Sequence, residues 1–147
     1  MKKNIITEKE LNCRDNDYVD HIEGEVWKTI EEYPNYIISN MGRVFTKNRN
    51  KVLKPFLCPI KSRENKVLYF IVKLTNKFGA VKNMFVHRVV ALAFVENAEN
   101  KPIIHYIDHN ELNNRADNLM WVTADEHKKF HAKDKEATRK KRKDVSK

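Results

Sequence analysis

The chain has 147 residues, 41% of them hydrophobic, and its 29 Lys and Arg side chains against 20 Asp and Glu give a formal net charge of +9. This length allows one modest hydrophobic core, or two small ones in series. No apolar run in the sequence approaches membrane-spanning length, and the start lacks the apolar stretch of a secretory signal. We therefore expect an intracellular protein of the host cytoplasm or nucleus, with no membrane partner.

The positive charge is concentrated near the C-terminal end. Residues 128–147 hold ten basic and three acidic side chains, whereas residues 1–25 hold four and seven. A basic tail, here residues 134–147, favours contact with a polyanion such as nucleic acid, although a solvated tail that only aids solubility has the same composition. Its "RKKRK" segment, residues 139–143, could add nonspecific DNA affinity or act as a nuclear address.

The two cysteines, Cys13 and Cys58, are isolated and far apart in the sequence. Without a Cys-x-x-Cys spacing, they indicate neither a disulfide framework nor a thiolate metal site. Their pattern fits a reducing intracellular setting.

The N-terminal half predicts an arm followed by a small β-rich module. Residues 1–24 are polar and acidic with weak periodicity, which is typical of a flexible arm. Residues 25–84 carry the signals of an antiparallel β-module. Within it Val44 begins a short strand, and residues 47–51 form a basic, hairpin-like link.

A longer hairpin is predicted at the end of that module. Residues 66–74 are β-branched and aromatic and indicate a buried strand. A turn at residues 76–79 leads to its partner strand at residues 80–87. Residues 88–96 fit either a short helix or another strand, and their Ala pair and the loop that follows favour the helix.

The next module, residues 85–133, ends in the order strand, long loop, strand and helix. The stretches "PIIHYI" and "LMWVT" have strand character and enclose the polar loop "DHNELNNRADN". Thr123 and Glu126 form a capping box that opens the helix. The predicted fold class is α+β.

Three histidines surround this strand-to-helix junction. His127 and His131 lie four residues apart and hence on one helix face, and His105 comes from a facing strand. Taken singly, each is more simply a surface or satisfied core histidine. Together they can converge three imidazole nitrogens on one zinc-like ion and leave a coordination position open.

The asparagines of the loop have a simpler explanation. Asn113 and Asn114 fit turn residues whose amides bond the loop backbone. Asn118 leads directly into the second strand, where a purely local turn role is less expected.

The stretch from Phe85 to His131, with "VHRVVALAFVENAENKP" followed by "DHNELNNRADNLMWVT", resembles an HNH endonuclease of the ββα-metal superfamily. The preceding stretch "EVWKTIEEYPNYIISNMGRV" is similar to the small DNA-associated motif that precedes the HNH module in phage and intron-borne homing endonucleases. Together they cover residues 25–131. The resemblance implies a small β-rich DNA-associated module at residues 25–84, a ββα-metal nuclease module at residues 85–133, and double-stranded DNA as partner.

Carried over residue by residue, the resemblance implies a role for each motif position. His105 falls on a metal ligand, and His127 and His131 match the further ligands of the three-His variants. Asn118 falls on the Asn that positions the general base through its backbone. Tyr106 falls where the family has the His that acts as general base. One divalent ion is implied, and three imidazoles favour zinc, manganese, nickel or cobalt over magnesium.

Tyr106 is the departure from the pattern. An imidazole accepts a proton near neutral pH, whereas a phenol remains protonated, so a Tyr at this position predicts an impaired nuclease. If it occupies the place of the base, its hydroxyl is expected to point toward the metal. His109, where the family usually has Gly, offers a substitute imidazole.

Basic side chains near the predicted strands and the metal module are candidate phosphate contacts. Taken alone, each of them is also explained as ordinary surface charge. They are Arg43, Lys47, Arg49, Lys51, Arg88, Arg115 and Lys128.

The sequence supports a metal-dependent endonuclease that nicks or cleaves duplex DNA, as a monomer or homodimer. A DNA-binding protein that keeps the fold and a structural metal but has lost catalysis is the alternative that Tyr106 favours. An RNA-binding or structural β-rich module is a third interpretation, which leaves the three-His spacing unexplained.

Overall fold

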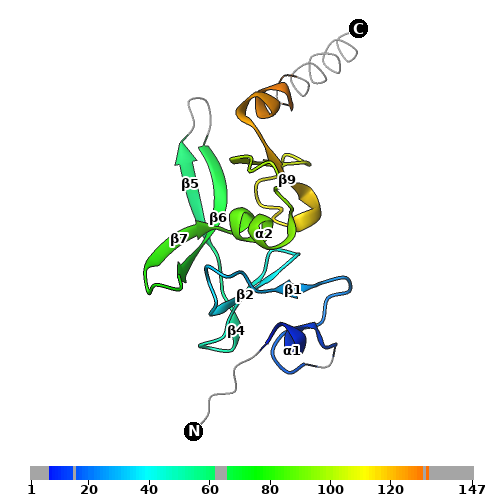
Figure 1. Ribbon diagram of the computed structural model, residues 1–147, viewed down its shortest axis with the longest axis vertical. Coiled ribbons are helices and arrows are strands. Elements are labelled where there is room, and N and C mark those ends of the chain that lie inside the picture. Colours follow the sequence, from blue (N-terminus) through cyan, green and yellow to red (C-terminus); the bar gives the residue numbers. More distant parts are fainter. Residues whose placement is uncertain (1–6, 15, 62–65, 131, 133–147) are drawn as a thin grey trace.

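The computed structural model describes residues 7–14, 16–61, 66–130 and 132. The described part of the chain forms three antiparallel sheets. In Figure 1 the four-stranded sheet lies nearer the described N-terminal residues, and the other two sheets lie nearer residues 124–130 at the opposite end of the long axis. The mixed α and β content matches the predicted fold class. Among the described helices, none is long and apolar enough to cross a membrane.

The first sheet follows the chain order β1-β2-β3-β4. Its strands are β1 (Trp27–Lys28), β2 (Tyr36–Ser39), β3 (Val44–Thr46) and β4 (Lys51–Val52). The strand predicted to begin at Val44 and the hairpin link after it are confirmed, because β3 and β4 pair across residues 47–50.

The second sheet has the order β5-β6-β7. Strand β6 (Lys66–Thr75) pairs with β7 (Val81–Phe85), so the long hairpin predicted from β-branched residues is confirmed. Its turn is held by Asn76, whose side-chain oxygen accepts from the backbone N–H groups of Phe78 and Ala80 at 3.0 and 2.9 Å. Strand β5 (Phe56–Lys61) was not predicted, because Cys58 and Pro59 interrupt the β-strand pattern.

The third sheet is the hairpin of β8 (Ile103–Tyr106) and β9 (Leu119–Val122). Helix α2 (Val86–Phe94) precedes it, and the helix expected after the β6–β7 hairpin is thereby confirmed. A single 3₁₀ turn, Ala116–Asn118, leads into β9, and residues 124–130 are helical. This part contains the two strands and the final helix predicted for the second module.

The described part of the expected flexible arm packs on the first sheet instead. Helix α1 (Glu8–Asn12) begins at Thr7 with a capping box. Leu11 is buried in a small apolar cluster with Trp27, Ile37 and Phe45. The Asn12 side chain both accepts from the Trp27 backbone N–H at 2.7 Å and donates to the Trp27 carbonyl at 3.0 Å. One apolar residue and one Asn thus anchor a segment that is otherwise polar.

One core spans the two predicted modules. Val44 of the first sheet and Val72 of the second belong to the same buried cluster as Val89 of α2 and Trp121 of β9. The Trp121 indole donates to the Val95 carbonyl at 3.1 Å, which fixes β9 against the end of α2. The boundary expected near residue 84 therefore separates two sequence motifs and not two independent cores.

The two modules also meet at a close backbone contact. Gly42 has φ +89°, and a Cβ on it would lie 3.2 Å from Asn114 Cβ and 3.3 Å from the Asn114 carbonyl oxygen. Next to it, the Ala116 N–H donates to the Asn40 carbonyl at 2.8 Å. A glycine is needed here both for its positive φ and for this close approach.

Candidate active site

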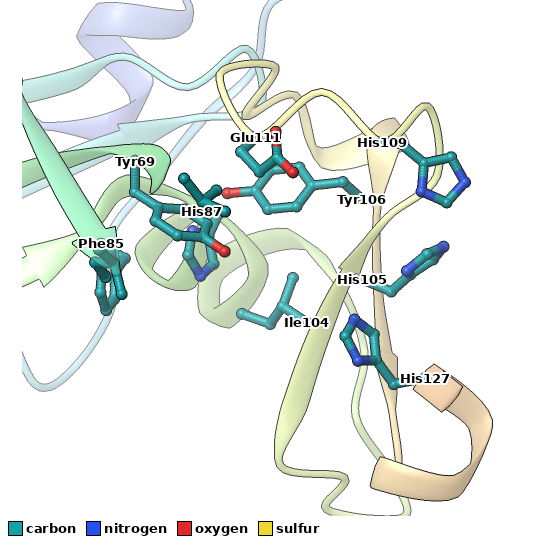
Figure 2. A pocket seen from close by; sticks show the side chains of 11 residues that line it. Tyr69, Phe85, His87, Ile104, His105, Tyr106, His109, Glu111 and His127 are labelled. Carbon is teal, nitrogen blue, oxygen red and sulfur yellow. The ribbon is translucent and has the colours of Figure 1, made fainter. Parts of the chain in front are cut away.

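The β8–β9 hairpin carries the predicted catalytic dipeptide. His105 lies opposite Met120 and Tyr106 lies opposite Leu119. Successive residues of a strand point to opposite faces, so the His105 and Tyr106 side chains diverge. Figure 2 shows His105 directed toward His127 and His109, and Tyr106 directed toward Tyr69.

Three imidazoles gather on the His105 side of the hairpin. The ring centroids of His105 and His127 are 5.7 Å apart, and those of His105 and His109 are 5.2 Å apart. Phe130 stacks on the His105 ring at 4.8 Å. His109 adopts a positive φ of 61°, which bends the loop after β8 so that its ring lies beside His105. We call His105, His109 and His127 the imidazole end of the site.

His127 is positioned by the start of the final helix. The predicted capping box is confirmed: the Thr123 N–H donates to Glu126 and the Glu126 N–H donates to the Thr123 hydroxyl, both at 3.2 Å. Glu126 also pairs with Lys101 at 3.0 Å, which connects the helix to the segment before β8. His131 lies outside the described residues.

The chemistry of this donor set fits a metal ion. Two imidazoles that ligate one zinc at a tetrahedral angle hold their ring centres about 5 Å apart, close to the His105–His127 separation. In the described ranges, no group of three His, Cys, Asp or Glu side chains is arranged to hold a metal. His105 and His127 therefore fit as two ligands, and the third predicted ligand, His131, falls outside those ranges.

The long loop between β8 and β9 is organised around Asn118. Its side-chain oxygen accepts from the Asp108 N–H at 2.9 Å, and its amide nitrogen donates to the Asp108 carboxylate at 2.8 Å and to the Asn113 carbonyl at 3.0 Å. Its own carbonyl accepts from the Ile107 N–H at 2.8 Å. Asn118 thus fixes the backbone directly after Tyr106.

Asp108 of this loop was not predicted from the sequence as a site residue. Hydrogen bonds from the Asn113 side chain and the Asn110 backbone, followed by that of Asn118, lower the pKa of its carboxyl group below the ordinary value. Asp108 is therefore ionised and holds the loop that presents His109. Its position two residues after Tyr106 in an Asn-rich loop was the available signal.

The Tyr106 hydroxyl does not point toward the imidazole end. It donates to Asn114 Oδ1 at 3.1 Å, and the side chain is buried. Burial, with smaller contributions from Tyr69 and Glu111, raises the pKa of the Tyr106 hydroxyl above its ordinary value. The expected orientation was wrong, because a buried phenol needs a hydrogen-bond partner and Asn114 supplies it.

A second group of side chains borders the same pocket on the Tyr106 side. The pocket has a volume of ≈ 430 Å³ and includes the imidazole end together with Tyr69, Phe85 and His87. The His87 ring stacks on Phe85 at 5.1 Å and meets the Tyr106 ring edge-on at 5.3 Å. We call Tyr69, Phe85 and His87 the aromatic end. None of them was singled out from the sequence, because their convergence depends on the pairing of β6 with β7.

The predicted DNA-contacting cations do not form one surface. Arg43 pairs with the buried Glu25 carboxylate and lies over the Trp27 ring, so its charge is already neutralised within the protein. Arg49 and Lys51 are exposed at the β3–β4 turn, toward the end of the long axis opposite residues 124–130 (Figure 1).

The remaining predicted cations differ in their surroundings. Lys47 lies half-buried at the start of the same turn. Arg88 is exposed over the Trp121 ring, and Arg115 pairs with Asp117 at 3.4 Å. Lys128 is exposed on the helix that carries His127. The basic segment at residues 139–143 lies outside the described residues.

Comparison with known proteins finds a family match for each of two segments of the chain. Residues 25–75 match the NUMOD4 motif, and residues 84–129 match the HNH endonuclease family. Residues 84–129 are thus similar to an HNH endonuclease module. The imidazole end, the Asn118 loop and the pocket all lie in or border this HNH module.

Individual proteins agree with this assignment. An uncharacterized HNH endonuclease of Acanthamoeba polyphaga mimivirus is 41% identical over 106 residues, which cover 69% of this chain and 25% of the viral protein. The DNA endonuclease I-HmuI of Bacillus phage SP01 is 35% identical over 98 residues, covering 66% of this chain and 52% of I-HmuI.

A solved structure that describes DNA binding and cleavage by the HNH homing endonuclease I-HmuI superposes with a TM-score of 0.58 and 31% identity. It covers 76% of this chain and 58% of that chain. The chain thus spans about half or less of the length of the relatives that it matches, and its fold is that of the matched part.

Proposed function

We propose that this chain is a metal-dependent endonuclease that hydrolyses phosphodiester bonds of duplex DNA. The observation that carries the proposal is the convergence of His105, His109 and His127 at one end of a pocket in the HNH module. A relative named as a DNA endonuclease is similar to this chain over 98 residues, and the solved structure that it resembles describes DNA binding and cleavage.

The metal would be held by His105 and His127, with His131 as the expected third ligand. A divalent cation bound there supplies positive charge to the phosphate and to the leaving oxygen. His105 is 5% exposed and is backed by Phe130, so it is a preorganised imidazole that needs little reordering to bind.

His109 is the proposed proton acceptor. Its ring lies beside His105 at the imidazole end, whereas the Tyr106 hydroxyl is buried and donates to Asn114. In the proposed step a water gives one proton to a His109 nitrogen, its oxygen forms a bond to phosphorus, and the bond from phosphorus to the leaving oxygen breaks. Asn118 and Asp108 act as positioning residues, because they hold the loop that bears His109.

Tyr106 then has a structural role at the position where the family places its base. A protonated, buried phenol can accept no proton from water, so the chain depends on His109 and is expected to be slower than a nuclease with His at position 106. A DNA-binding protein that has lost catalysis is the competing function, and the Tyr106 substitution is the observation in its favour.

Phosphate contacts are proposed for the exposed cations Arg49, Lys51, Arg88 and Lys128. Arg43 is no longer favoured, because removing it from the buried Glu25 would leave an unpaired carboxylate. Double-stranded DNA is the proposed partner, and either a monomer or a homodimer is compatible with the proposal.

Plasmid nicking with a series of divalent ions tests the proposal. The parent protein should convert supercoiled DNA to the nicked or linear form with at least one of zinc, manganese, nickel, cobalt and magnesium, and His105→Ala should abolish the conversion. A parent protein that binds the plasmid but cuts it with none of these ions would establish the competing DNA-binding function.

A further inference from the structure

His87 is a polar side chain that the proposed hydrolysis does not use. Among the described residues, His87 Nδ1 is the buried side-chain nitrogen or oxygen atom that lacks a hydrogen-bond partner. Buried polar atoms in folded proteins are nearly always paired, so an unpaired nitrogen at the edge of a pocket calls for a functional explanation.

The surroundings of His87 define its tautomer. Burial, aided by the charge of Arg88, lowers the pKa of His87 to about 4, so the ring is uncharged at neutral pH. A bare acceptor nitrogen costs less to bury without a partner than an N–H group does. We therefore assign the proton to Nε2, so that the buried Nδ1 is a bare acceptor and His87, which lines the pocket, carries a neutral N–H donor.

Aromatic rings surround this donor. Phe85 stacks on the His87 ring at 5.1 Å, and Tyr69 lies 5.6 Å from it and 5.4 Å from Phe85. Ile60 and Val67 complete the apolar wall of the pocket. Aromatic faces beside a neutral donor suit a nucleobase, which stacks on the rings and accepts the hydrogen bond.

The aromatic end is joined directly to the imidazole end. Tyr106 follows His105 in β8, and its ring meets that of His87 at 5.3 Å. Both ends border one pocket (Figure 2). Bases succeed one another about every 3.4 Å along a strand, so a phosphate at the imidazole end brings a flanking nucleotide to the aromatic end.

We propose that the aromatic end, Tyr69, Phe85 and His87, binds the base of a nucleotide next to the scissile phosphate, with His87 Nε2 donating a hydrogen bond to that base. This inference rests on the proposed endonuclease function and adds a subsite to it. Stacking on the aromatic rings would offset the cost of removing the base from the duplex stack.

The test uses single-turnover cleavage of a short duplex that contains a cut site mapped on plasmid DNA. Abasic sites are placed one at a time at the nucleotides on either side of the cut. With the parent protein, one of these positions should slow cleavage by about tenfold, the usual effect of losing one stacked base.

His87→Phe is the decisive variant, because it keeps a flat ring and removes the donor. His87→Phe should cleave the intact duplex several-fold more slowly than the parent does. The abasic site should then slow cleavage by this variant by less than about threefold. Its unfolding temperature should be unchanged or higher, since the variant removes an unpaired buried nitrogen. Phe78→Ala, which removes an aromatic ring that is 83% exposed outside this pocket, is the matched control and should behave as the parent.

The outcomes separate the two proposals. If the parent cuts no DNA, the endonuclease function fails. If the parent cuts but no flanking abasic site slows it, or if the abasic effect is the same in His87→Phe, the base subsite is refuted while the endonuclease stands. If His87→Phe is strongly destabilised, His87 is a packing residue and the subsite is refuted as well.

Discussion

The Tyr106 hydroxyl donates a hydrogen bond of 3.1 Å to the side-chain oxygen of Asn114, and both residues are buried. Asn114 is also the residue against which Gly42 of the NUMOD4 motif packs. The Tyr106 side chain therefore helps to hold the loop between β8 and β9 against the preceding motif.

Tyr106→Phe should destabilise the protein with little effect on cleavage. The change leaves Asn114 Oδ1 buried without a donor, which costs about 1–3 kcal/mol in the free energy of unfolding. Urea unfolding measures this loss, and Tyr18→Phe, which removes a hydroxyl from an exposed tyrosine, is the control. A large loss of cleavage at unchanged stability would show that the phenol acts in the reaction.

Acid should weaken the loop through Asp108. The pKa of this carboxyl group is lowered in the folded protein, so its stabilising effect is present above the ordinary value and is lost as the pH falls through the folded value. The urea midpoint of the parent should exceed that of Asp108→Asn at pH 7, and the difference should shrink near pH 3. A difference that is the same at both pH values would contradict the assigned hydrogen bonds.

The metal site should prefer a transition metal over magnesium, because imidazole is a borderline-soft ligand. Equilibrium dialysis with zinc or cobalt should give about one ion per chain, and His127→Ala should weaken the binding by at least about tenfold. His21→Ala replaces an exposed histidine near Glu23 and should bind as the parent does. Unchanged stoichiometric binding by a His127→Ala plus His131→Ala double variant would refute this site.

Deleting residues 134–147 should weaken duplex binding. This tail carries seven basic and three acidic residues, and each lost phosphate contact lowers the salt dependence of binding. The slope of log affinity against log salt concentration should fall by at least about one. Equal affinity and an equal slope in the truncated protein would leave the tail as a solubilising extension only.

Local signals in the sequence predicted much of this fold. The β-branched run and the Asn-to-Gly turn specify the β6–β7 hairpin, and Thr123 with Glu126 specifies the start of the final helix. Each of these features is decided by residues within a few positions of one another. The proximity of His105 to His127 was also predicted, because the helix follows directly on β9, the strand that pairs with β8.

Features that depend on distant partners were not predicted. The direction of Tyr106 is decided by Asn114 and by the packing of Tyr69 and His87 around it. Arg43 was predicted to contact DNA. Its pairing with Glu25, eighteen positions earlier, was not predicted because no local sequence signal marks it. Helix α1 was missed because a single buried Leu11 in a charged segment gives no periodicity.

Cleavage by His109→Ala is the sharpest test of His109 as the proton acceptor. Single-turnover nicking of a plasmid by the parent, His109→Ala and Tyr106→Phe should be compared at equal metal occupancy. We predict that His109→Ala cuts roughly 10²–10⁴-fold more slowly than the parent, while Tyr106→Phe stays within a few-fold of it. A His109→Ala variant that cuts as fast as the parent would contradict the assignment of His109 as the proton acceptor.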